Sequence, residues 1–197
     1  MTMCLAQQPD ADELLDRDPL ALLVGMLLDQ QIPMEKAFAG PQVLARRMGV
    51  DHLDAAEIAH ADPGVFAKMF IGPPAIHRFP GAMAARVQAL AAVVLEEYGG
   101  DAAAVWSTAA SGERLLERLA ALPGFGAQKA RIFLALLGKQ RGVRPRGWRE
   151  ASAPYGAEGV FQSVADVTDA EALRKVREHK KEMKAAAKQA SSKKPSR

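Results

Sequence analysis

Apolar residues recur at helical spacing along most of the chain, and β-branched runs are absent. An almost wholly apolar segment follows Asp18-Pro19 and continues to Pro33, which predicts a buried helix over 19–31 with Asp18 as its N-cap. The same pattern predicts further helices over 34–48 (ended by Gly49), 52–59 (capped by Asp51), 63–69 (capped by Asp62), 82–98 (closed by Gly99-Gly100), 111–120, 127–137 (ended by Gly138), and 170 to the high 180s (capped by Asp169). Residues 139–160 are rich in Gly and Pro and predict an irregular segment with one helical turn near Trp148. The fold class predicted is all-α.

The composition is that of a soluble globular chain. With 197 residues and 49% apolar content, it is long enough for one compact unit or two closely packed subdomains. Cys4 is the single cysteine and the four histidines are scattered, so we expect no disulfide, no metal and no iron–sulfur cluster. No run of about 18 apolar residues occurs, which favours a cytoplasmic protein without a membrane partner.

Charge is distributed unevenly. Residues 174–197 contain ten Lys and Arg against Glu178 and Glu182, a net charge of +8. Because the whole chain carries +3, residues 1–173 carry a net charge of −5. Such a basic end attracts polyanions. It is equally typical of a solvated, disordered extension, and we expect a basic disordered tail over 186–197.

Residues 113–138 predict two helices joined by the tight loop Leu122-Pro123-Gly124-Phe125-Gly126. Two glycines around one apolar residue allow a sharp turn with free backbone amides. Those amides and the amino end of the following helix would form a site for an anion such as a DNA phosphate. The alternative is a plain helix connection with a glycine cap.

Positive charge follows this loop without an intervening acid. Seven basic residues carry it: Lys129, Arg131, Lys139, Arg141, Arg144, Arg146 and Arg149. In an otherwise acidic body, this run indicates a surface for a nucleic-acid backbone.

The segment LPGFGAQKA resembles the helix-hairpin-helix of the endonuclease III and 3-methyladenine DNA glycosylase II superfamily, whose hairpin reads Leu-Pro-Gly-apolar-Gly. The segment DPLALLVGMLLDQQIPMEKAF resembles the buried helix that those enzymes place about a hundred residues earlier. Together the two motifs cover roughly residues 14–138.

The resemblance implies a two-subdomain helical glycosylase fold: a barrel over 14–138 that contains the hairpin at about 113–138, and a second subdomain from 1–13 with 139–185. The target base would be flipped into the cleft between them, as burial of the glycosidic bond in duplex DNA requires. Gln31 matches the family's gap-filling glutamine, although a helix-terminal residue that bonds backbone groups is the alternative. Phe79 is a weaker candidate for a side chain that intercalates on the other strand, with a place in the core as the alternative.

In bifunctional members a nucleophilic lysine occupies the position that is Gln128 here, so the resemblance implies no strand-cleaving chemistry. The residues expected to contact double-stranded DNA are Gln31, Gly124, Phe125, Gly126, Gln128, Lys129 and Arg131. The family's catalytic aspartate would fall near Arg146 to Trp148, where no acid occurs. Glu150 and, more remotely, Asp166 are the candidate carboxylates; Glu150 could instead pair with Arg149 or Arg146.

Trp148 and Tyr155 are candidates for stacking on an extruded base, with ordinary packing as the alternative. We expect a monomeric, nucleoid-associated base-excision-repair protein, a monofunctional DNA glycosylase. Two alternatives stay open: a catalytically inactive binder of DNA lesions with the same fold, and a helical scaffold that binds protein through its hairpin.

Overall fold

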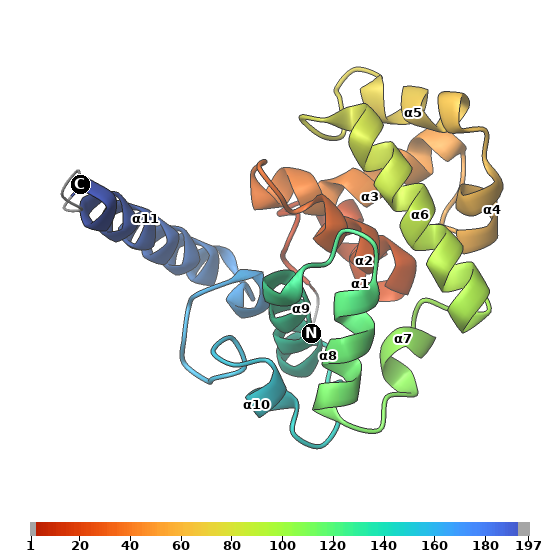
Figure 1. Ribbon diagram of the computed structural model, residues 1–197. Coiled ribbons are helices and arrows are strands. Elements are labelled where there is room, and N and C mark those ends of the chain that lie inside the picture. The colour runs from red at the N-terminus through yellow and green to blue at the C-terminus, as the bar shows by residue number, and fades with distance from the viewer. Residues whose placement is uncertain (1–2, 193–197) are drawn as a thin grey trace, which may run out of the picture.

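A computed structural model describes the backbone of residues 3–192 and the side chains of residues 3–186. Within these residues the chain is helical and contains no strand, which confirms the all-α prediction (Figure 1). The elements are α1 (Pro9–Arg17), α2 (Pro19–Leu28), α3 (Met34–Met48), α4 (Ala55–His60), α5 (Pro63–Ile71), α6 (Pro80–Tyr98), α7 (Ala104–Ser107), α8 (Gly112–Ala121), α9 (Ala127–Gln140), α10 (Trp148–Ala151), the 3-10 turn η1 (Val164–Asp166) and α11 (Ala170–Ser192). No helix in this range is both long and apolar enough to cross a membrane.

Aspartate side chains begin several of these helices. Asp18 accepts a hydrogen bond from the Ala21 amide at 2.9 Å, as predicted, and its second oxygen accepts one from the Leu53 amide at 2.7 Å. Asp62 caps α5 as predicted, and Asp169 accepts from the Ala172 amide at the start of α11. The predicted cap Asp51 is wrong, because Asp54 accepts from the Glu57 amide and α4 starts three residues later than expected.

Helix α2 is the centre of the core. Every residue from Leu20 to Leu28 is buried, and the helix packs against α1, α3 and α6. A Cβ on Gly25 would lie 2.8 Å from the ring of Phe38, so this glycine allows close contact between α2 and α3. The helix ends at Leu28 rather than at residue 31, because the chain turns out of the core into a left-handed conformation at Gln31, with φ of 57°.

Helices α8 and α9 pack against each other and are joined by the five-residue loop 122–126. The loop is anchored by its apolar residues, since Leu122 and Phe125 are buried and the Phe125 ring contacts the ring of Phe133 edge-on. Gly124 takes a left-handed conformation with φ of 80°, which a residue with a Cβ rarely adopts.

Gly138 does not end α9, contrary to the prediction, and the helix continues to Gln140. A Cβ at position 138 would lie 2.3 Å from the ring of Trp148, so the glycine makes room for the indole on the flank of the helix. Trp148 is 6% exposed and belongs to the core.

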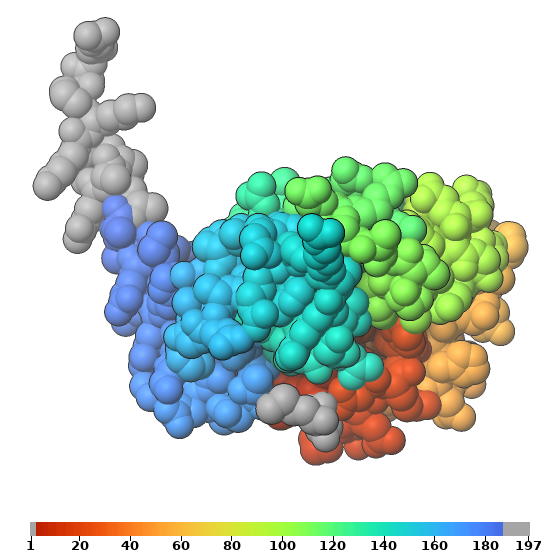
Figure 2. Space-filling model, turned by 90° about the horizontal axis from the view of Figure 1, so that it is seen from below, coloured from red at the N-terminus to blue at the C-terminus, as the bar shows by residue number. Residues whose placement is uncertain are grey.

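The elements fall into groups that follow chain order. Helices α1 to α6 pack among themselves, α8 to α10 pack together with η1 against α9, and α11 projects from the body (Figure 1). Residues 139–170 lie beside the amino-terminal helices, where Arg141 forms an ion pair with Asp16 (Figure 2). The subdomain boundaries expected at 14–138 and 139–185 stay a prediction. The backbone of α11 continues as a helix to Ser192, and the rest of the expected 186–197 tail lies outside the described residues.

Candidate active-site cleft

A cleft of about 1150 Å³ opens between three parts of the molecule: the loop between α2 and α3, the amino end of α9, and the first turns of α11. Its wall also includes the segment around Tyr155 and residues 162–164. Gln31, Gln128, Lys129 and Tyr155 are the sequence candidates that line it. The structure therefore brings together residues from both motifs, which lie about a hundred positions apart in the chain.

The α2–α3 loop is held in place by Gln30, the residue before Gln31. Gln30 donates a hydrogen bond to the Leu27 carbonyl, and its own side-chain oxygen accepts one from Arg86. Its backbone carbonyl lies 2.9 Å from Nε2 of the buried His77, whose Nδ1 accepts the Phe79 amide. The side chain of Gln31 itself is exposed at the cleft.

His77 fixes the loop that carries Phe79. An Nδ1 that accepts requires the proton on Nε2, so the ring is the neutral tautomer that donates to Gln30. Burial lowers the pKa of His77, in keeping with that neutral form. His77 therefore ties the loop that carries Phe79 to the loop that carries Gln31. The Phe79 side chain is 43% exposed.

The amino end of α9 faces the cleft without a side-chain cap. Gly126 is the N-cap residue and is exposed, and a Cβ there would meet nothing within 4 Å. The first amide of α9 bonded to a backbone carbonyl is that of Ala130, which donates to Gly126. The preceding amides of the helix are therefore open to a ligand, as a phosphate site at this end requires.

Gln128 and Tyr155 form a pair across the cleft wall. The Gln128 amide donates a hydrogen bond to the Tyr155 hydroxyl at 2.9 Å. Tyr155 is half-buried and lines the cleft, whereas Trp148 does not and is packed inside the core.

Lys129 turns its ammonium group toward the carboxyl end of α2. It donates to the carbonyls of Met26 at 2.7 Å and Leu27 at 2.8 Å. Burial lowers the pKa of Lys129 to about 8, with Asp29 acting in the opposite direction. An ammonium has three protons, so one remains for a group in the cleft.

Asp29 is a cleft residue that the sequence analysis missed. Burial raises its pKa, while Lys180 and Lys129 oppose the shift. In the described part of the chain, the Asp29 carboxylate has no hydrogen-bond or ion-pair partner. Every fully buried side-chain oxygen there has a partner, so the oxygens of Asp29 are not fully buried. The carboxylate is therefore open to the cleft. The other cleft carboxylate among the described residues, Glu35, is paired with Arg177.

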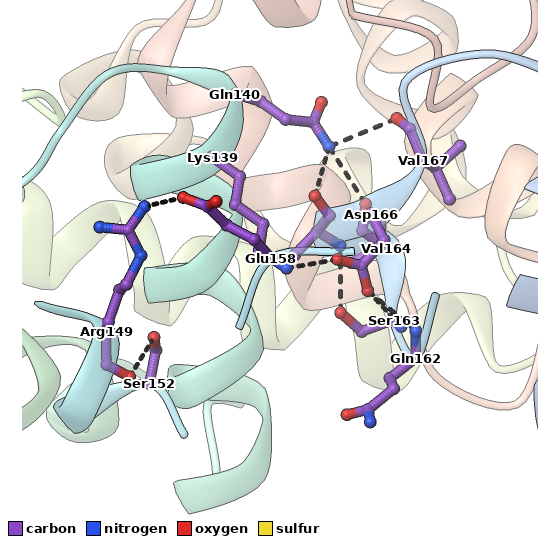
Figure 3. A network of polar contacts seen from close by, with 11 residues as sticks. Lys139, Gln140, Arg149, Ser152, Glu158, Gln162, Ser163, Val164, Asp166 and Val167 are labelled. Atoms are coloured by element: carbon purple, nitrogen blue, oxygen red, sulfur yellow. Dashed lines mark hydrogen bonds and ion pairs between the residues drawn. The ribbon is translucent and has the colours of Figure 1, made fainter. Parts of the chain in front are cut away.

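The two carboxylates chosen from the sequence lie elsewhere. Glu150 is exposed on α10 and does not line the cleft; its expected partner Arg149 pairs with Glu158 instead. Asp166 is held in a closed network, shown in Figure 3. It accepts from Lys139 at 2.5 Å and from the amides of residues 162 and 163, and its side chain is 3% exposed.

The basic run after the loop does not form one open surface. Lys139, Arg141 and Arg149 are each paired with an acid, and Arg144 donates to the Gly138 carbonyl. Arg131 is exposed on α9 but does not line the cleft. Positive charge within the cleft comes from Lys129 and from α11 instead.

Among residues 3–186, no group of three or more His, Cys, Asp or Glu side chains is placed to hold a metal ion.

Comparison of the chain with known protein families, with curated proteins and with solved structures finds no match.

Proposed function

We propose that this protein binds double-stranded DNA in base-excision repair and acts as a monofunctional DNA glycosylase, which hydrolyses the N-glycosidic bond of a damaged base. The observation that carries the proposal is the cleft. Two motifs that resemble the helix-hairpin-helix glycosylases meet across it, and it holds one carboxylate without a bonded partner together with a partly buried ammonium group.

Binding would begin at the α8–α9 loop. The uncapped amino end of α9 offers backbone amides to a phosphate, and such a contact reads no base sequence. The exposed side chain of Gln31 would fill the gap left by the extruded base, whose unstacking costs a few kcal/mol. Tyr155, on the cleft wall, offers a ring on which that base can stack.

Asp29 is the residue that we assign to the chemical step, in place of Glu150 and Asp166. Departure of the base leaves positive charge on the sugar, and a nearby carboxylate stabilises that charge or accepts a proton from attacking water. The oxygen of water bonds to the anomeric carbon, the carbon–nitrogen bond breaks, and one proton ends on the departing base. Lys129 would stabilise the negative charge that develops on that base.

Strand cleavage is not part of the proposal. At Gln128 an amide replaces the amine that would form a Schiff base, and this amide is bonded to Tyr155. Lys129 is one position further along α9 and donates to two carbonyls of α2.

A second candidate function is a catalytically inactive binder of DNA lesions. It is favoured by one observation: of the two carboxylates predicted from the sequence, Glu150 does not line the cleft and Asp166 is closed in an ion pair with Lys139. This protein would use the same cleft to hold a lesion without breaking a bond.

The test is base release under single-turnover conditions from duplexes that carry alkylated, deaminated or oxidised bases. We expect release from at least one duplex, and a loss of about 10²- to 10⁴-fold in Asp29→Asn. Glu150→Gln is the matched control and should retain the rate. Salt-sensitive binding without release from any duplex would favour the inactive binder, and no binding at all would exclude both functions.

A further inference from the structure

Helix α11 forms one wall of the cleft, and the acids among its described side chains share one face. Glu171, Glu178 and Glu182 recur at spacings of seven and four residues and so share one face. Arg177, Lys180 and Lys184 recur at spacings of three and four and share another, which lines the cleft. At about 100° per residue, the acidic face points away from the cleft.

The cations of α11 differ in their partners. Arg174 and Lys175, on the side of the acids, form ion pairs with Glu178 and Glu171 within α11. Lys180, Lys181 and Lys184 have no ion-pair partner among residues 3–186, and of these three Lys180 and Lys184 line the cleft. Their charge is therefore available to a ligand in the cleft.

The base of α11 is fixed so that this face is turned toward the cleft. Leu173 and Val176 are buried, and Arg177 pairs with Glu35 of α3 across the cleft. The charge of Lys180 also acts on the carboxyl group of Asp29 at the opposite wall. Beyond this point the helix leaves the body, as Figure 1 shows.

We infer that Lys180 and Lys184 form a second phosphate-binding site, which holds the backbone of the same DNA duplex that the amino end of α9 binds on the opposite wall of the cleft. The inference rests on the proposed function and adds to it a surface that the two recognised motifs do not contain. Lys180 and Lys184 are separated by four residues, about 6 Å along the helix, and their long side chains can reach neighbouring phosphates. A polyanion satisfies both charges at once.

The experiment measures the affinity of the full chain for a short duplex as a function of salt concentration. Each phosphate contact contributes about 0.9 to the slope of log K against log salt. We expect Lys180→Ala/Lys184→Ala to make the slope shallower by about 1 to 2 and to weaken binding at every salt concentration. Arg174→Ala/Lys181→Ala removes the same charge from the other side of α11 and should change the slope far less.

Lys180→Arg/Lys184→Arg keeps the charge and should keep the slope, and circular dichroism checks that all variants keep their helix. If wild type binds with a steep slope and both alanine pairs change it equally, the second site is excluded while DNA binding stands. Should wild type bind no duplex at low salt, the proposed function itself fails. The two failures therefore have different signatures.

Discussion

Helix α9 carries two lysines ten positions apart, and each lies near an aspartate from a distant part of the chain. At the carboxyl end, Lys139 bonds Asp166 directly at 2.5 Å, and two backbone amides complete the shell of that carboxylate. At the amino end, Lys129 bonds two backbone carbonyls, and Asp29 is left without a bonded partner in the cleft. The first pair closes a polar network inside the fold, whereas the second keeps a carboxylate and an ammonium proton available to a ligand.

The first way to test this contrast is to break the closed pair. Asp166→Ala leaves the ammonium of Lys139, 16% exposed, without its counter-ion, which should cost about 3–5 kcal/mol in the free energy of unfolding. Denaturant unfolding measures the loss.

A double variant, Lys139→Met/Asp166→Leu, should recover much of that stability because no unpaired charge remains. In the folded fraction of Asp166→Ala, base release should persist. A large loss of release at unchanged stability would instead assign Asp166 to the chemistry.

The second prediction concerns pH and the open pair. Because the pKa of Lys129 is about 8 in the folded protein, the rate of base release should fall by up to tenfold per pH unit above pH 8 as the ammonium loses its proton. Lys129→Arg should move this decline to higher pH, since a guanidinium stays charged. Single-turnover rates between pH 6 and 10 provide the measurement, and an identical decline in the arginine variant would rule out Lys129 as its source.

The smallest expected effect is a gain in stability from removing the open carboxylate. Burial raises the pKa of Asp29 in the folded state above that in the unfolded state. The unfolded chain therefore loses this proton first as pH rises, and stability falls with rising pH between the two pKa values. Asp29→Asn should unfold at a higher temperature than wild type at neutral pH, by the equivalent of about 1 kcal/mol, while losing activity. At pH 3, where both states are protonated, the difference should vanish.

Local chemistry made much of the fold predictable. The caps Asp18, Asp62 and Asp169 and the breakers Gly49 and Gly99 act within one turn of their own helix, so the sequence reveals them directly. Helix ends that depend on distant packing were not predictable. Gly138 has the signature of a helix end, yet α9 continues because the Trp148 ring covers that glycine.

The residues of the candidate site also divide into those that local sequence reveals and those that depend on distant parts of the chain. Gln31 and the hairpin motif could be found from motif and spacing, and Gln31 reaches the cleft together with Gln128 and Lys129, which follow the 122–126 loop. Asp29 could not be singled out, since a polar residue after a buried helix is usually an ordinary end. Its importance arises from Lys129 and Lys180, which come from helices 100 and 151 positions later and act on its charge.

Trp148 contacts both helices of the hairpin, α8 through its backbone and α9 through its indole ring, and these contacts limit how the chain can diverge. A Cβ on Gly112 would lie 2.5 Å from the Trp148 Cα, a backbone atom that no side-chain movement can displace. The three atoms nearest to a Cβ on Gly138 all belong to the indole ring. A larger residue can therefore replace Gly138 if a smaller residue replaces Trp148 at the same time. No change of side chain at position 148 makes room for a Cβ at position 112, because the obstacle there is backbone. The angle between α8 and α9, and with it the orientation of the 122–126 loop, therefore depends on a glycine at the far end of α8.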